Sequence, residues 1–198
     1  MIDAERPLIL ASASPRRAEI LTTLRIPFEV QPSGIDERAI QAVEDAAFVR
    51  AVALAKLDHV VATLDEGRWA LAADTMVCVD GRRLGQPEDD EDARRMIDLL
   101  QGREHRVVTG VVLGESARGA VAAIVVESVV RFRSIERDEI IRYVATGEGR
   151  DKAGAYAVQG LASGFVEKLE GSYTNVVGLP AADVVVLLKE HGAIDAWP

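Results

Sequence analysis

The chain has 198 residues, of which 48% are hydrophobic, so it is long enough to bury a core and too apolar for a disordered protein. Its 23 basic and 32 acidic residues give a formal net charge of −9 at pH 7. An acidic chain is a poor general binder of duplex nucleic acid or of an anionic membrane surface, because affinity for these partners depends on neutralising phosphates. A small anionic ligand would therefore need basic residues gathered in one place.

Cysteine and histidine usage excludes further classes of protein. The single cysteine, Cys78, permits no internal disulfide and no cysteine-rich zinc site, and the three histidines have no metal-binding spacing. The N-terminus does not resemble a signal peptide, and the apolar stretches are far shorter than the ~20 residues that a membrane helix needs. We therefore expect a soluble, reduced, cytoplasmic protein.

Strands and helices alternate in the first part of the chain. We expect a strand over residues 8–11, a helix over 15–25, a strand over 28–31, a helix over 45–64 and a strand over 69–79. The first helix has Ser14 as its N-cap and a proline at its first position. The strand over 69–79 is nearly all apolar and ends in Asp80-Gly81, a hairpin-turn pair.

The second part of the chain predicts one hairpin and three helices. We expect a helix from Pro87 to about Gln101, strands over 106–113 and 121–132, and helices over 136–145 and 180–191. The two strands are rich in β-branched residues and are separated by a turn, which predicts a long hairpin. Hairpins and crossovers both occur, so the pattern indicates an α/β fold with a mixed sheet.

Seven glycines lie between Thr146 and Pro180, and we expect this stretch to form loops that make tight turns or approach a ligand. The dinucleotide fingerprint and the Walker pattern both fail here, because the glycine spacing and the position of Lys152 do not fit them. Gln159 could contact the edge of a base, although an ordinary loop glutamine is the alternative.

The segment SASPRR, residues 12–17, places Arg16 and Arg17 in the first turn of a helix. A helix N-terminus already carries partial positive charge and unpaired N–H groups, so two cations there are unfavourable. A phosphate bound by the N–H groups, Ser12, Ser14 and the arginines would resolve the conflict. The alternative is a solvated helix whose arginines pair with nearby acids.

Two charged residues lie in otherwise apolar patterns. Lys56 is about 20° from Val49 around the axis of its predicted helix, so it points along the apolar stripe; a snorkelling lysine is the alternative. Asp74 interrupts a buried-strand sequence, where a carboxylate is costly unless it is paired or binds a metal. Its neighbour Thr75 points to the opposite face if the pleat is regular.

The adjacent carboxylates Asp36 and Glu37 follow a predicted strand. Mg²⁺ typically takes one or two carboxylates together with phosphate oxygens and water, so this pair could supply a ligand. An ordinary polar loop is the alternative.

Several segments that lie in order along nearly the whole chain match one family pattern. They are LILASASPRRAEIL at 8–21, GIDER at 34–38, Lys56, LAADTMV at 71–77, GREHRVVTGV at 102–111, and the stretch from DKAGAYAVQG to GSYTNVVGLP at 151–180. Together they resemble the Maf (septum formation inhibitor) family of nucleoside triphosphate pyrophosphatases. The SPRR, ADT and VQG variants resemble the branch that prefers dTTP and UTP.

The resemblance implies hydrolysis of a nucleoside triphosphate between its α- and β-phosphates, with Mg²⁺ or Mn²⁺ as cofactor. It implies that Asp74 accepts a proton, that Asp74 and Glu37 hold the metal, and that Lys56 neutralises phosphate charge. The implied fold is a single Maf/ITPase-like α/β domain over 1–198, with a mixed twisted sheet and two lobes flanking a nucleotide-binding cleft. Such proteins often form homodimers.

By the same resemblance, five further residues bind the substrate: Ser14 and Arg17 at the phosphates, and Arg16, Thr75 and Gln159 at the base. Lys152 is a further candidate, as an additional cation of the cleft. One position departs from the family. Gln86 stands in Gly-Gln-Pro, where the family usually has Gly-Lys-Pro with the lysine in the active cleft. We therefore expect weaker turnover or altered substrate choice. The rival hypothesis is a nucleotide-binding regulatory protein of cell division with weak or no turnover.

Overall fold

The computed structural model describes residues 1–198, apart from the side chain of Arg38. The chain forms two compact units. The first comprises residues 1–74, 109–126 and 178–198, and the second comprises residues 75–108 and 127–177. Three long strands therefore contribute residues to both units.

A mixed seven-stranded sheet runs in the order β2-β1-β3-β5-β6-β7, with β4 paired to β3. Its strands are β1 (Leu8–Leu10), β2 (Phe28–Val30), β3 (Trp69–Val79), β4 (Arg82–Leu84), β5 (Glu104–Glu115), β6 (Gly119–Phe132) and β7 (Val166–Glu170). β1 pairs in parallel with β2 and β3, whereas β4 and β7 pair antiparallel with β3 and β6. The expectation of a mixed α/β sheet is confirmed.

Six α-helices are described: α1 (Pro15–Thr23), α2 (Asp45–Val61), α3 (Asp90–Leu100), α4 (Arg137–Ala145), α5 (Tyr173–Val177) and α6 (Ala181–Glu190). Three short 3₁₀ segments cover Glu37–Ala39, Ala153–Ala155 and Leu161–Phe165. No helix in the described part of the chain is long and apolar enough to cross a membrane.

Most predicted elements are confirmed, and four predictions need correction. The helix expected over 45–64 ends at Val61. The helix expected to open at Pro87 begins at Asp90, because Asp89 is its N-cap and accepts a hydrogen bond from the backbone N–H of Asp92. The first helix ends at Thr23 rather than at residue 25. The stretch 146–180, expected to be loop, contains the strand β7 and the short helix α5.

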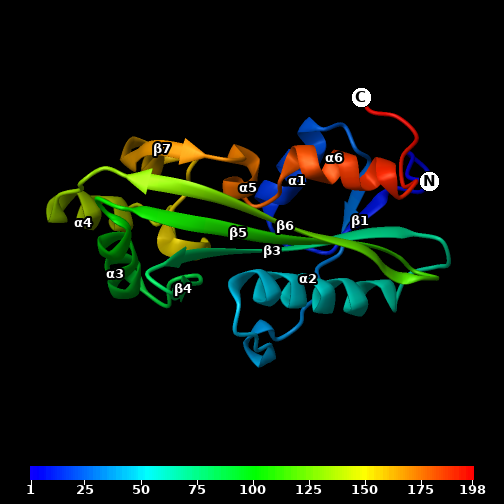
Figure 1. The fold of residues 1–198 in the computed structure, drawn as a ribbon, viewed down its shortest axis with the longest axis horizontal. Helices are drawn as coiled ribbons and strands as arrows, with labels where there is room; N and C mark the ends of the chain where they lie inside the picture. The colour runs from blue at the N-terminus through cyan, green and yellow to red at the C-terminus, as the bar shows by residue number, and fades with distance from the viewer. The chain divides into compact units, whose positions relative to one another are not determined.

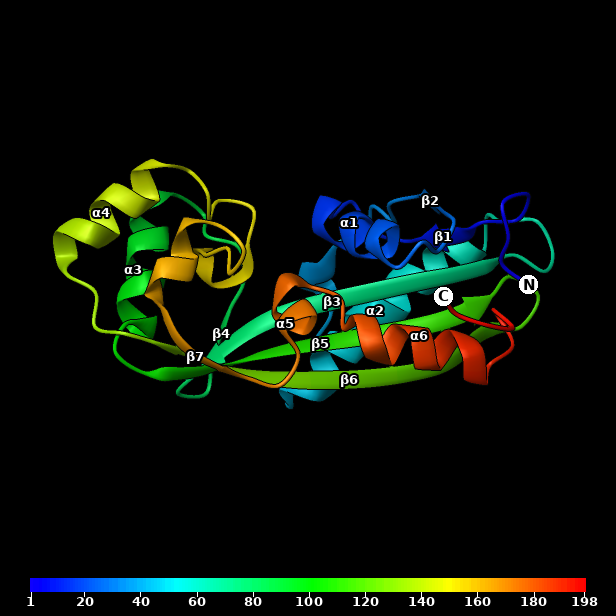
Figure 2. The ribbon, with the colours of Figure 1, turned by 90° about the horizontal axis from the view of Figure 1, so that it is seen from above.

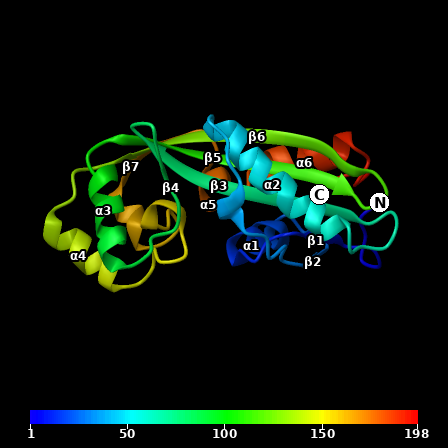
Figure 3. The ribbon, with the colours of Figure 1, turned by 90° about the horizontal axis from the view of Figure 1, so that it is seen from below.

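In the first unit, α2 covers one face of the sheet and α6 lies over the other (Figures 1 and 3). A buried apolar cluster of α2, β1, β3 and β5 residues fills the space beneath α2. The approach is close at Gly110 of β5, where an added Cβ would lie 2.7 Å from the carbonyl oxygen of Val49. Only glycine allows the backbone of α2 to lie this near to the strand, and the position of α2 along β5 is therefore fixed.

In the second unit, α3 and α4 pack side by side (Figure 2). The core beside them contains a group of aromatic rings in edge-to-face contact, with the Phe132 centroid 4.9 Å from both His105 and Tyr156. His105 is 2% exposed, and its Nε2 lies 2.8 Å from the hydroxyl of Tyr156. Its Nδ1 is buried and has no hydrogen-bond partner among the described residues.

His105 should make the stability of the protein depend on pH. Burial lowers the pKa of His105 to about 4, whereas an unfolded chain has a histidine pKa near 6.5. Between these two values the unfolded chain binds a proton that the folded chain does not, so the free energy of unfolding falls as the pH decreases from about 6.5 to 4. Over that range the contribution of His105 amounts to about 3 kcal/mol.

Urea unfolding at pH 7, 6 and 5 measures this dependence. His105→Gln removes the titrating group and keeps a partner for Tyr156, so the slope of stability against pH should decrease. His59→Gln, at an exposed position of α2, serves as the control. An unchanged slope in His105→Gln would contradict the prediction.

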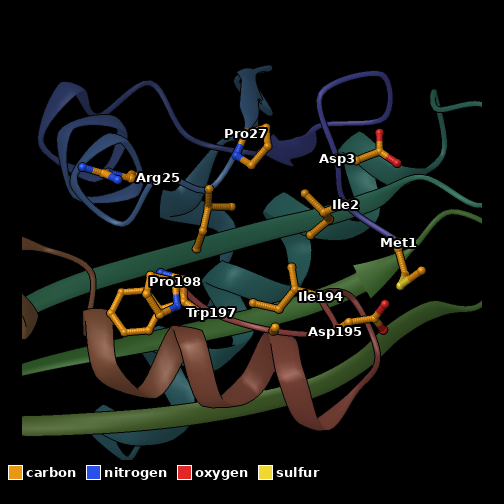
Figure 4. Close-up of a pocket in the computed structure, with 11 residues that line it drawn as sticks. Met1, Ile2, Asp3, Arg25, Pro27, Ile194, Asp195, Trp197 and Pro198 are labelled. Atoms are coloured by element: carbon orange, nitrogen blue, oxygen red, sulfur yellow. The ribbon is translucent and has the colours of Figure 1, made fainter.

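A cavity of about 330 Å³ lies in the first unit beside the terminal segments of the chain (Figure 4). Its walls include Asp3, Arg25, Ile194 and Trp197. The indole Nε1 of Trp197 donates to the backbone carbonyl of Leu24 at 2.8 Å, which holds this segment beside α1. None of the site residues predicted from the sequence lines the cavity.

Candidate active site

In the first unit, two carboxylate side chains contact the ammonium group of one lysine. The Nζ of Lys56 lies 2.8 Å from Oε1 of Glu37 and 2.9 Å from Oδ1 of Asp74. The side chains of Lys56 and Asp74 are only 10% and 11% exposed, whereas that of Glu37 is 51% exposed. The group carries one positive and two negative charges, so it keeps an excess negative charge beside solvent.

The sequence pattern explains why Lys56 is buried. Val49, Ala53 and Val60 are at most 1% exposed and form the inner stripe of α2, and Lys56 lies on the same stripe with 8% exposure. The predicted position of Lys56 along the apolar stripe is confirmed, and the alternative of a lysine snorkelling to solvent is wrong. Its charge is instead paired inside the protein, which offsets the cost of its burial.

Asp74 lies in the middle of β3 and is 8% exposed. Burial raises the pKa of Asp74 above its ordinary value, while the nearby charges of Lys56 and Arg17 act in the opposite direction. A carboxylate whose pKa is raised towards neutrality is a better proton acceptor for water than an exposed one. The environment of Asp74 therefore suits a general base.

Arg17 is buried at the start of α1 and contacts a distant part of the chain. Its Nε donates to the carbonyl oxygen of Gly178 at 2.9 Å, and its Nη1 donates to the hydroxyl of Ser12 at 2.9 Å. Burial lowers the pKa of Arg17, and Asp74 raises it. The guanidinium therefore connects the SASPRR segment to residue 178 and also adds positive potential at Asp74.

Ser14 is the N-cap residue of α1, as predicted, but its side chain makes no capping hydrogen bond. Its backbone N–H donates to the hydroxyl of Ser12 at 3.2 Å. No acidic residue lies in the first turn of α1, where Arg16 and Arg17 stand. The unfavourable charge arrangement expected from the sequence is thus present in the structure, and a bound phosphate would relieve it.

The ligand atoms offered by Glu37 and Asp74 indicate which metal ion these residues could hold. Among the described residues, no three His, Cys, Asp or Glu side chains come together in a way that could bind a metal ion. The carboxylates of Glu37 and Asp74 nevertheless converge on one cation, Lys56. Two hard oxygen ligands fit Mg²⁺ or Mn²⁺, which complete their coordination with phosphate oxygens and water, and they do not fit a zinc site.

The other predicted residues belong to the second unit. The Nε2 of Gln86 donates to the backbone carbonyl of Asp151 at 3.2 Å, and the Nζ of Lys152 lies 2.5 Å from Oδ1 of the same Asp151. Gln86 and Lys152 thus contact the same residue, Asp151, so a cation lies near Gln86. Thr75 is half-buried on β3, and Gln159 is exposed after the buried residue Val158.

A family model described as Maf-like protein matches residues 7–191. The chain belongs to the Maf-like family. The match includes all the residues that meet at Lys56 and all those placed around Asp151.

Curated relatives extend this result over nearly the full length. A dTTP/UTP pyrophosphatase of Moorella thermoacetica is 47% identical over 190 residues, covering 96% of this chain and 97% of the relative. A dTTP/UTP pyrophosphatase of Geobacter metallireducens is 47% identical over 189 residues, with 94% and 97% coverage.

Among solved structures, a HAM1 protein from Coxiella burnetii aligns with a TM-score of 0.50 and 16% identity, covering 96% of this chain and 100% of that chain. At this identity the comparison concerns the fold alone. It confirms the expected relation of this Maf-like chain to Ham1/ITPase-like folds.

Sequence reasoning missed two residues that contact candidate site residues, Gly178 beside Arg17 and Glu148 beside Lys152. Gly178 contributes only its backbone carbonyl to Arg17, so no side-chain pattern marks it. Glu148 was not singled out either, because a glutamate in a glycine-rich stretch resembles any solvated loop residue. Its hydrogen bonds to Tyr143, Leu161 and Ala162 are visible only in the folded chain.

Proposed function

We propose that this Maf-like protein hydrolyses dTTP, UTP or a modified pyrimidine nucleoside triphosphate between the α- and β-phosphates, giving the nucleoside monophosphate and pyrophosphate. One observation carries the proposal: a buried carboxylate, Asp74, and a second carboxylate, Glu37, meet at the ammonium group of Lys56. The relatives named dTTP/UTP pyrophosphatase, at 47% identity, support the choice of substrate.

In this proposal Asp74 accepts a proton from the attacking water. The water oxygen bonds to one of the two phosphorus atoms of the α–β bridge, and the bond from that phosphorus to the bridging oxygen breaks. Pyrophosphate is the leaving group if the α-phosphorus is attacked, and the nucleoside monophosphate is the leaving group if the β-phosphorus is attacked; both routes give the same two products. Lys56 exchanges its contact with the carboxylates for a phosphate oxygen, and Arg17 adds positive potential. Fixed charges of this kind stabilise the charge that develops on a transferring phosphoryl group.

Glu37 and Asp74 would hold the divalent metal. When bound, Mg²⁺ or Mn²⁺ supplies positive charge that polarises phosphate oxygens and favours attack by water. Ser14, Arg16 and the N–H groups of α1 would contact phosphates or the base. In the second unit we assign base selection to Thr75 and Gln159, and phosphate contact to Lys152. Because the chain has a single cysteine, Cys78, and therefore no internal disulfide, we also propose the reducing cytoplasm as the compartment.

Pyrophosphate release from a panel of nucleoside triphosphates, with Mg²⁺, with Mn²⁺ and with a chelator, tests the proposal. We expect release from dTTP and UTP above that from purine triphosphates, and no release after chelation. Tight binding of these nucleotides without any release would instead favour the rival hypothesis of a nucleotide-binding regulatory protein, which the Gln86 position motivates.

Gln86→Lys tests the departure from the family pattern. The added ammonium would be placed beside Asp151, as Lys152 already is, and would neutralise one more phosphate charge. We expect kcat/KM for dTTP or UTP to rise about tenfold, which corresponds to about 1.4 kcal/mol of transition-state stabilisation. Arg83→Lys, which alters a neighbouring position without changing its charge, is the control. An unchanged kcat/KM on every active nucleotide would show that the interpretation of Gln86 is wrong.

A further inference from the structure

Glu148 follows α4 and makes an unusual number of contacts for a residue in a glycine-rich loop. Its Oε2 accepts a hydrogen bond from the backbone N–H of Leu161 at 2.8 Å. Its Oε1 accepts one from the N–H of Ala162 at 3.3 Å and one from the hydroxyl of Tyr143 at 3.1 Å. One carboxylate thus satisfies three donors from two separate segments.

The contacts to Leu161 and Ala162 replace a missing helix cap. The 3₁₀ segment Leu161–Phe165 begins after Gly160, which has no side chain to cap it. The carboxylate of Glu148 fills that role from a distance in the sequence, since a negative group at a helix start pairs with its free N–H groups. A Cβ at Gly160 would lie 2.2 Å from Oε2 of Glu148, so the glycine is what lets the carboxylate come so close.

Glu148 holds the chain after Gln159 through Leu161 and Ala162, and Tyr143 links Glu148 to the chain before Gln159. Its hydroxyl, which donates to Glu148, accepts a hydrogen bond from the backbone N–H of Ala157 at 3.3 Å. Ala157 comes two residues before Gln159, and Leu161 comes two residues after it. The pair Glu148–Tyr143 therefore fixes the backbone on both sides of Gln159.

The same residue also holds Lys152. The Nζ of Lys152 donates to the backbone carbonyl of Glu148 at 2.7 Å. The two candidate substrate-binding residues Lys152 and Gln159 are thus attached to one residue within the second unit.

We propose that Glu148 is a positioning residue that sets the base preference of the site, because it fixes the short segment that presents Gln159. This inference rests on the proposed function, in which Gln159 contacts the base. A carboxylate is required rather than an amide. Glutamine would offer one acceptor oxygen, and its NH₂ group would face either the N–H donor of Leu161 or, with the amide turned over, the donors of Ala162 and Tyr143.

Calorimetric binding of non-hydrolysable α,β-imido analogues of dTTP and dGTP, with Mg²⁺, measures base preference without turnover. We expect the wild-type protein to favour the dTTP analogue and Glu148→Gln to lower that preference about tenfold, the effect of misplacing about one hydrogen bond. Tyr143→Phe removes the connection to Ala157 and the hydrogen bond from the tyrosine hydroxyl to Glu148, but it leaves the contacts of Glu148 to Leu161 and Ala162, so it should lower the preference by a smaller factor. Glu104→Gln, at an exposed position of β5, is the matched control and should leave the preference unchanged.

The Tm of each variant is measured to show that it folds. If Glu148→Gln does not fold, the binding preference of Tyr143→Phe tests the inference. A preference that stays at the wild-type value in the folded variants would overturn the inference, as would a wild-type protein without any preference. Failure of the proposed function would appear differently, as absence of pyrophosphate release with the binding preference intact.

Discussion

Asparagine in place of Asp74 should lower kcat for pyrophosphate release by about 10²–10⁴-fold, the usual effect of losing a general base. The two side chains have nearly the same shape, but the amide cannot accept a proton from water at neutral pH. Lys56 keeps its contact with Glu37 at 2.8 Å, so its charge is not left unpaired in the interior.

Pyrophosphate release and binding of the α,β-imido dTTP analogue should be measured side by side for Asp74→Asn. We expect binding to persist when release is lost, because several other residues contact the nucleotide. Asp80→Asn is a matched control: it makes the same change at the turn after β3, where Asp80 has a φ of 48° that asparagine also tolerates. If Asp74→Asn keeps more than a tenth of the wild-type kcat, Asp74 is not the base.

Methionine in place of Lys56 should lower kcat at least about 100-fold and at the same time tighten the binding of Mn²⁺. The loss of activity follows from removing a charge that stabilises the phosphoryl group. The gain in metal affinity follows from the contacts at 2.8 and 2.9 Å, since the ammonium of Lys56 now neutralises the carboxylates that would hold the metal. Removing a unit charge at that distance should strengthen Mn²⁺ binding about tenfold or more.

Titration calorimetry with Mn²⁺ in the absence of nucleotide measures the second effect independently of activity. Lys189→Met, at an exposed position of α6, controls for the general loss of a positive charge. Weaker or equal Mn²⁺ binding by Lys56→Met would show that Glu37 and Asp74 are not the metal ligands.

The elements that could be predicted from the sequence are those whose signal is local. The strand over 69–79 was predicted with both of its ends, because an apolar run and the Asp80-Gly81 turn mark them. The start of α3 was misjudged because Pro87 and Asp89 are both good helix-start residues, and the capping hydrogen bond that decides between them forms only in the folded chain. β7 was missed because its side chains are mostly exposed, so its sequence lacks the apolar alternation of a half-buried strand.

In the candidate site, too, local signals could be predicted from the sequence and contacts between distant residues could not. Lys56 and Asp74 could be found because each breaks an apolar pattern of its own element, and a charge in a buried place requires a partner. Their pairing with each other and with Glu37 could not be found, since nothing in the sequence indicates which charges meet. The contacts of Glu148 are hidden for the same reason, since the carboxylate acts on backbone N–H groups that every residue except proline possesses.

The hydrogen bond from Arg17 to Gly178 spans 161 positions of the chain. During synthesis, the N-terminal SASPRR segment leaves the ribosome long before its acceptor exists. Until residue 178 emerges, the guanidinium of Arg17 lacks that carbonyl, although the hydroxyl of Ser12 in the same segment is already present. Because residues 178–198 belong to the first unit, that unit cannot be complete before the whole second unit has been synthesised. A nascent chain therefore cannot bind nucleotide in the proposed way until synthesis is nearly complete.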